Sequence, residues 1–126
     1  PELLFSDGSV DYTKVSQTIE FTEGIQNLIE EIKSDKIIAI MCSEKDPFDC
    51  HRFVLISHQL EKKGITVKHI LGNGDVVLND TLEDKLIHQY NIDFHQTTLF
   101  GSAKTKAEAL EEAYVERNKD IVGASK

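Results

Sequence analysis

The sequence lacks tryptophan and has one methionine, two prolines and two cysteines among its 126 residues. Two cysteines are too few for the disulfide framework of a small secreted domain, so we expect reduced thiols. No apolar run reaches the roughly 18 residues that a membrane helix needs, and the N-terminus has no signal-peptide pattern. These absences favour a cytoplasmic protein that does not enter a membrane.

Positive charge is also scarce, because 14 Lys and Arg residues stand against 22 Asp and Glu, for a formal net charge of −8. An acidic surface without a Lys/Arg-rich run repels phosphate backbones, so nucleic acid is not an expected partner. The charge is unevenly spread: residues 42–72 hold five cations and four anions and carry +1, which leaves −9 for the rest. A small anionic ligand would therefore meet least repulsion there.

The hydrophobic pattern fits one small domain with one core. Apolar residues recur at helical spacing over about 18–33, which predicts an amphipathic helix. The run at 36–42 is apolar and rich in β-branched residues, as in a strand covered on both faces of a parallel sheet. A helix over about 47–63 and an alternating strand at 65–71 complete a right-handed βαβ unit.

We therefore predict an α/β fold of three layers around a mostly parallel sheet. A short antiparallel edge strand is expected at 76–78, after a glycine-rich turn. The peripheral helices are predicted at about 18–33, 80–90 and 104–120. Because open α/β sheets usually have four or more strands, we expect residues 1–126 to be one domain, a C-terminal fragment lacking its N-terminal strands. A homo-oligomer would be another way to complete the sheet.

The residues best suited to chemistry follow the first predicted strand. Cys42 ends that strand, and Cys50, His51 and Arg52 lie in the first turns of the next helix. Ligands of open α/β sheets bind at the carboxyl ends of strands, beside helix N-termini. We therefore expect a small-anion site here, in which the planar fork of Arg52 holds the anion. The candidate ligand-binding residues are Glu44, Lys45 and Arg52.

The same segment carries the motif Cys-x-Glu-Lys-x-Pro-x-x-Cys-His-Arg, and Gly64–Ile70 follows it. This pattern resembles the signature of the bacterial family catalogued as domain of unknown function 488. The likeness covers nearly the whole chain, because it extends to the segments Asp11–Tyr12, Phe21–Ile25, Gln96–Phe100 and Glu112–Tyr114. It implies an uncharacterised activity, and a further N-terminal strand and loop with an Asp-Val-Arg stretch that this chain lacks.

A looser likeness is to the rhodanese-type sulfurtransferases, in which a cysteine at a strand end precedes a phosphate-like loop and a helix. Cys42 stands at the nucleophile position, and Gly64–Val67 matches the later Gly-x-x-V strand. The loop departs from that pattern, because it takes ten residues from Cys42 to Arg52, contains no glycine and holds three acids. The likeness implies thiol-dependent group transfer, in which Cys42 attacks, His51 tunes the thiolate and Arg52 holds the anion.

The candidate catalytic residues are thus Cys42, Cys50 and His51. Cys42 could instead be a small apolar residue packed at a strand end. Arg52 could instead form an ion pair with Glu44 or Asp49. We predict no metal site, because a structural zinc site needs four ligands and the other histidines are scattered. A reversible Cys42–Cys50 disulfide is conceivable but is not the preferred interpretation.

Several alternatives stay open at this point. The helix after the motif could begin at Asp46 or at Asp49, and only the second start leaves its first amides available to a ligand. His69 alternates with Val67 and Leu71, which indicates a half-buried strand histidine. The sequence indicates no cofactor and leaves open whether the chain is an enzyme. A non-catalytic binding or assembly module is the first alternative, and a nucleic-acid-associated factor is the second.

Overall fold

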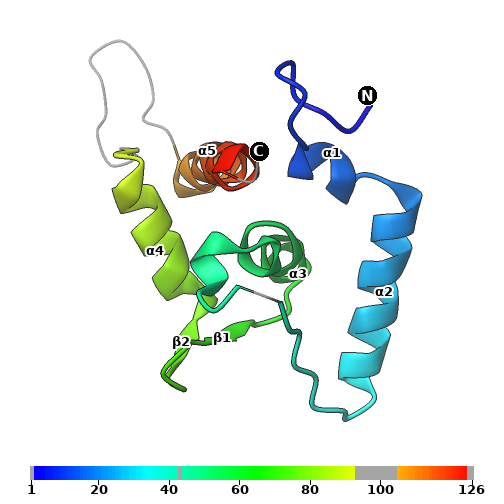
Figure 1. The fold of residues 1–126 in the computed structure, drawn as a ribbon. Coiled ribbons are helices and arrows are strands. Elements are labelled where there is room, and N and C mark those ends of the chain that lie inside the picture. Colours follow the sequence, from blue (N-terminus) through cyan, green and yellow to red (C-terminus); the bar gives the residue numbers. More distant parts are fainter. Residues whose placement is uncertain (1, 43, 93–104, 125–126) are drawn as a thin grey trace.

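The computed structural model describes residues 2–42, 44–92 and 105–124 and has mixed helix and strand content (Figure 1). In chain order the elements are α1 (Tyr12–Ser16), α2 (Ile19–Lys33), the 3-10 turn η1 (Pro47–Asp49), the π-helical segment η2 (Arg52–Ser57), α3 (His58–Lys62), β1 (Lys68–Ile70), β2 (Val76–Leu78), α4 (Asn79–Gln89) and α5 (Lys106–Ala124). Within these ranges we find no helix that has both the length and the hydropathy needed to span a bilayer.

A central helix organises the molecule. The backbone is helical without a break from His51 through η2 to the end of α3 at Lys62. The helices α1 and α2 pack on one side of this central helix, whereas α4 and α5 lie on the other (Figure 1). In the widened turn of η2, the Ser57 hydroxyl donates to the carbonyl oxygen of Arg52 at 2.7 Å. Such π-helical turns are frequent near functional sites.

The main core forms where the central helix meets α4 and α5. Phe53 of η2 is fully buried there, with ring-centroid distances of 5.8 Å to Phe48 and 5.3 Å to Tyr114. The buried members of this core are Phe48, Phe53, Val54, Leu82, Leu86, Ile87, Ala113 and Tyr114. A smaller cluster of Ile25, Ile29 and Leu60 attaches α2 to α3. The two cores hold the central helix from both sides.

The strands form a two-stranded antiparallel sheet, in which His69 of β1 faces Val77 of β2. Gly74, with φ of 91°, supplies the left-handed residue of the turn between them. This arrangement confirms the predicted edge strand at 76–78. His69 is more deeply buried than expected, at 3% exposed, and its Nε2 lies 2.8 Å from Oδ1 of Asn79. His69 is therefore a strand histidine, as predicted, but it is buried rather than half-buried and is hydrogen-bonded to Asn79.

The predicted three-layer parallel sheet with its βαβ unit is not seen among the described residues. Residues 36–42 form no strand, and the side chains of Ile37 and Met41 are exposed. The predicted strand at 65–71 is reduced to three residues, which pair antiparallel with β2. A strand persists only where a neighbour pairs its N–H and C=O groups, and in the described part of the chain no strand pairs with residues 36–42.

The predicted helices agree better with the structure than the predicted sheet does. The amphipathic helix at 18–33 is confirmed as α2, and the helices predicted at 80–90 and 104–120 correspond to α4 and α5. The helix predicted at 47–63 is divided, because Cys50 is extended between η1 and the central helix. The prediction that residues 1–126 are a single domain stays a prediction.

Candidate dithiol site

The loop before the central helix is shaped by two successive caps. The Asp46 carboxylate accepts the N–H of Phe48 at 2.9 Å, which caps η1 behind Pro47. Cys50 then adopts an extended conformation, with φ of −135° and ψ of 148°, and the helical backbone begins at His51. Asp46 therefore caps the short turn only, and the main helix starts later, at a cysteine rather than at an aspartate.

Cys50 takes the place of the N-cap residue of the central helix. Its Sγ accepts the backbone N–H of Arg52 at 3.4 Å, and its carbonyl oxygen accepts the N–H of Phe53 at 3.1 Å. Side-chain oxygens usually fill this position, where they bond one of the first unpaired amides of the helix. The position directs an N–H dipole at the sulfur, which stabilises negative charge there.

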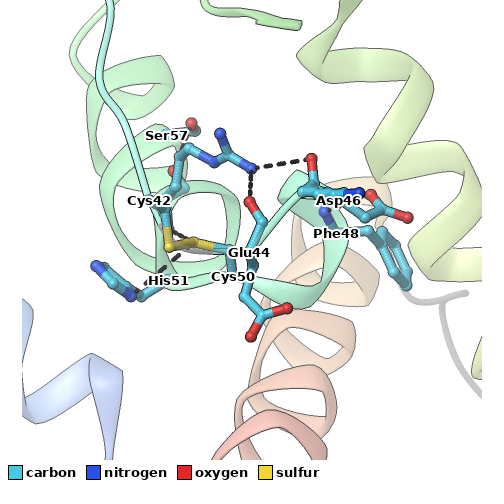
Figure 2. The surroundings of a disulfide bond; sticks show 9 residues. Cys42, Glu44, Asp46, Phe48, Cys50, His51 and Ser57 are labelled. Carbon is cyan, nitrogen blue, oxygen red and sulfur yellow. Dashed lines mark hydrogen bonds between the residues drawn. A yellow bond between two sulfur atoms is a disulfide. The ribbon is translucent and has the colours of Figure 1, made fainter. Parts of the chain in front are cut away.

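Cys42 and Cys50 are joined in a disulfide (Figure 2). This finding corrects the expectation of reduced thiols, which rested on the number of cysteines and not on their positions. The loop from Cys42 folds back onto the start of the central helix and so brings the two sulfurs together. Cys50 is only 2% exposed, whereas Cys42 is partly exposed, so the two sulfurs differ in access to solvent.

His51 lies beside this disulfide (Figure 2). Its side chain is exposed, and its Nδ1 is 4.0 Å from Sγ of Cys50. One ligand atom from each of Cys42, Cys50 and His51 lies within 4.8 Å of the other two. The structure thus brings together all three residues that the sequence marked as candidate catalytic groups.

Arg52 fastens the loop to the helix through main-chain oxygens. Its Nη2 donates to the carbonyl oxygen of Glu44 at 2.9 Å and to that of Lys45 at 3.4 Å. The side chains of Glu44 and Lys45 are exposed, so these residues contact Arg52 through their backbone. Asp49, the other predicted ion-pair partner, pairs with Arg117 instead. Whether Arg52 also binds an anion stays a prediction.

A cavity of about 370 Å³ lies between residues 38–41, the end of α2, α3 and β1. Arg52 and Lys68 border it and supply positive charge, and its other walls are mostly apolar. The apolar lining includes Leu28, Ile32, Ile38, Ile40, Leu60, Ile65, Val67 and Ile70. The predicted anion-binding residue thus lies at the edge of an apolar cavity.

Sequence reasoning missed Arg117 of α5, which contacts the loop at Phe48 and Asp49. Its Nε donates to the carbonyl of Phe48 at 3.1 Å, and its guanidinium lies 4.5 Å above the Phe48 ring. It also forms the ion pair with Asp49 that leaves this carboxylate unavailable as a helix cap. The available signal was its spacing of three from Tyr114, which places both side chains near one face of α5.

A second cluster, between α3 and α5, was also missed. His58 stacks on Tyr114 with 3.7 Å between ring centroids, and its Nε2 lies 3.1 Å from Oε1 of Glu111. Burial lowers the pKa of His58 to about 4, so this imidazole is neutral at pH 7 and its contact with Glu111 is a hydrogen bond. Lys62, at 2.6 Å from the same carboxylate oxygen, supplies the cation. This cluster borders a separate cavity of about 200 Å³.

Comparison with known families supports the resemblance found in the cysteine motif. Residues 2–59 match the family model of a domain of unknown function, DUF488. The DUF488 match includes the whole segment from Cys42 to Arg52 and ends within α3. It is thus confined to the N-terminal part of the chain and does not include Gly64–Ile70 or Glu112–Tyr114. The resemblance was expected to cover nearly the whole chain, so that expectation is corrected.

One further segment assigned to the resemblance, Gln96–Phe100, lies beyond the match and also outside the described residues. Neither the curated proteins nor the solved structures gave a significant match to the chain. The DUF488 match carries no assigned activity, so a function must be argued from the site itself.

Proposed function

We propose that Cys42 and Cys50 form a dithiol–disulfide site that exchanges with small anionic thiols. This proposal differs from the thiol-dependent group transfer expected from the sequence, in which Cys42 attacks. It develops instead the reversible Cys42–Cys50 disulfide, which the sequence left as a less favoured interpretation. The observation that carries the proposal is the unequal environment of the two bonded sulfurs. Cys42 is partly exposed, whereas Cys50 is buried and accepts the N–H of Arg52.

This asymmetry gives the reaction a direction. An incoming thiolate attacks Sγ of Cys42, because Sγ of Cys50 is shielded. The Cys42–Cys50 bond breaks, its electron pair stays on Cys50 as a thiolate, and a new disulfide joins the incoming sulfur to Cys42. The N–H of Arg52 stabilises the leaving thiolate on Cys50. A second thiolate then attacks the incoming sulfur, which releases a small-molecule disulfide and the Cys42 thiolate.

His51 and Arg52 have different parts in this proposal. When protonated, the imidazole of His51, 4.0 Å from Sγ of Cys50, would favour the thiolate form of that sulfur. Arg52 and Lys68 border the 370 Å³ cavity, where they would attract the carboxylates of a thiol substrate. The local excess of positive charge over residues 42–72 supports an anionic substrate in a chain that carries −8 overall.

The test uses the reduced full chain, with its reductant removed. Cysteines are alkylated with iodoacetamide over a range of pH, and the extent is read by mass spectrometry separately at each position. We expect Cys42 to react faster than Cys50, and the thiolate of at least one to form well below the ordinary thiol pKa of about 8.5. Chain unfolded in urea is the control, in which both cysteines should react alike. Ordinary or blocked reactivity at both positions in the folded chain would contradict the proposal.

A structural role of the motif is the second candidate, favoured by the bonds from Arg52 to the carbonyls of Glu44 and Lys45. In that case Arg52→Ala would destabilise the chain, while neither folded-state thiol would be activated. The alkylation experiment separates the two roles, because only an exchange site requires a reactive cysteine.

We also infer that the parallel sheet forms around residues 36–42 when a further strand pairs with them. Ile37 is fully exposed and Met41 is 89% exposed, although their apolar side chains suit a covered strand. Residues 38–41 lie across the 370 Å³ cavity from β1. Hydrogen exchange should find the amides of 37–41 unprotected in this chain, and slow exchange there would argue against an unpaired segment.

A further inference from the structure

We infer that reduction of the disulfide turns Cys42, Cys50 and His51 into a site for one zinc-class divalent ion. The inference rests on the proximity of their ligand atoms, all within 4.8 Å of one another. It rests on the cysteines of the proposed exchange site but makes His51 an essential ligand, whereas in the exchange reaction His51 only favours the thiolate form of Cys50. The two proposals can therefore fail separately.

The distances are close to those of a metal site. In tetrahedral zinc coordination, bonds of about 2.3 Å to sulfur and 2.0–2.1 Å to nitrogen place neighbouring ligand atoms about 3.4–3.8 Å apart. Nδ1 of His51 is already 4.0 Å from Sγ of Cys50. Once the S–S bond is broken, the two sulfurs can move apart by side-chain rotation. Cys42 and His51 have room to adjust because both are accessible, whereas buried Cys50 provides a fixed point.

The chemistry of the donors selects the ion. Two thiolates and one imidazole form a soft set that prefers zinc or its cobalt substitute to magnesium or calcium. Each thiol loses one proton on binding, so the two thiolates balance the charge of a divalent ion and two protons are released. The N–H of Arg52 continues to donate to the sulfur of Cys50 and orients this ligand. Three protein ligands leave a fourth position for water or a small anion, as in open zinc sites.

The ion and the disulfide exclude each other, because each uses the same two sulfurs. A reducing thiol opens the disulfide and creates the site. Oxidation by a small-molecule disulfide removes two electrons from the thiolates, forms the Cys42–Cys50 bond and releases the ion. Metal retention at this loop would thus follow the thiol–disulfide balance around the protein.

The experiment titrates Co²⁺ into the reduced full chain without oxygen. A single equivalent should produce the near-ultraviolet sulfur-to-cobalt charge-transfer band and the visible bands of tetrahedral coordination, and Zn²⁺ should abolish both. Cys42→Ser and Cys50→Ser should each weaken the charge-transfer band, and His51→Gln should weaken binding by about tenfold or more. His88→Gln is the matched control, since His88 is an exposed histidine of α4 and should leave binding unchanged.

A reduced chain that gives no sulfur-to-cobalt band would overturn the inference, as would full-strength binding by His51→Gln. Because His51 is exposed, this variant should fold, and circular dichroism checks that it does. Thiol exchange is measured in parallel with a chelator present. Exchange without metal binding would reject the metal site alone, and metal binding without exchange would reject the proposed function alone.

Discussion

The backbone N–H of Arg52 donates to the sulfur of Cys50 at 3.4 Å, so one cysteine both caps the central helix and forms half of the disulfide. Serine can keep the first role and alanine cannot, because only serine retains a side-chain acceptor. With all disulfides reduced, we expect Cys50→Ser to be more stable than Cys50→Ala by about 0.5–2 kcal/mol. Urea denaturation measures the difference, and an alanine variant of equal or higher stability would argue against the cap.

The disulfide itself should contribute to stability. It joins residues eight positions apart, and loop-closure entropy for so short a loop gives about 2.5 kcal/mol. We therefore expect dithiothreitol to lower the free energy of unfolding of the wild-type chain by about 2.5 kcal/mol. The double variant Cys42→Ser with Cys50→Ser is the control and should not respond to the reductant. If dithiothreitol also left the free energy of unfolding of the wild type unchanged, the bond would not form in solution.

Removal of the Arg52 side chain should loosen the loop. Arg52→Ala leaves the carbonyl oxygens of Glu44 and Lys45 without this donor, and loss of hydrogen bonds to a charged group costs about 1.5–3 kcal/mol. Lys63→Ala, at an exposed cation close to the end of α3, is the control and should change stability by less than about 0.5 kcal/mol. Equal urea midpoints for the two variants would mean that Arg52 does not hold the loop.

His58 should make the chain sensitive to mild acid. Burial holds the pKa of His58 in the folded chain at about 4, below its value of 6.5 in the unfolded chain. Between these two pH values His58 is protonated in the unfolded chain and neutral in the folded chain. The stability from neutral His58 is therefore complete above pH 6.5 and is lost as the pH falls from 6.5 towards 4. The full effect is about 3 kcal/mol by linkage. Burial also lowers the pKa of His69, which acts in the same direction.

Urea midpoints at pH 7.5 and 5 measure this loss. His58→Gln should lose less stability between the two pH values than the wild type, whatever its stability at pH 7.5. His88→Gln, at an exposed position, should keep the wild-type difference. An unchanged pH difference in His58→Gln would contradict the assignment to His58.

The helices could be predicted from sequence because their signals are local. The apolar residues Phe21, Ile25 and Ile29 recur at helical spacing, and they lie on the face of α2 that packs towards α3. The run at 36–42 has equally strong strand propensity, yet propensity cannot supply a hydrogen-bonding neighbour. Strand pairing depends on residues distant in the sequence, and this is where the predicted parallel sheet failed.

The candidate site was partly predictable because its signal, like that of the helices, is local in the sequence. Cys42, Cys50 and His51 were recognised from their spacing, and the structure brings them together. Their pairing as a disulfide was set aside because cysteine number is a guide to cellular compartment and not to local geometry. The bonds of Arg52 to carbonyl oxygens and the contact of Arg117 with Phe48 depend on how the loop folds. Neither set of contacts can be predicted from residue spacing.

The most direct test of the dithiol–disulfide account is equilibration of the chain in buffers of reduced and oxidised glutathione, followed by acid quenching and mass spectrometry. The account predicts that wild type interconverts between the dithiol and the Cys42–Cys50 disulfide, and that Cys50→Ser accumulates a glutathione adduct on Cys42. Cys42→Ser should form the corresponding adduct on buried Cys50 much more slowly. Free thiols at every glutathione ratio, or faster adduct formation on Cys50 than on Cys42, would contradict it.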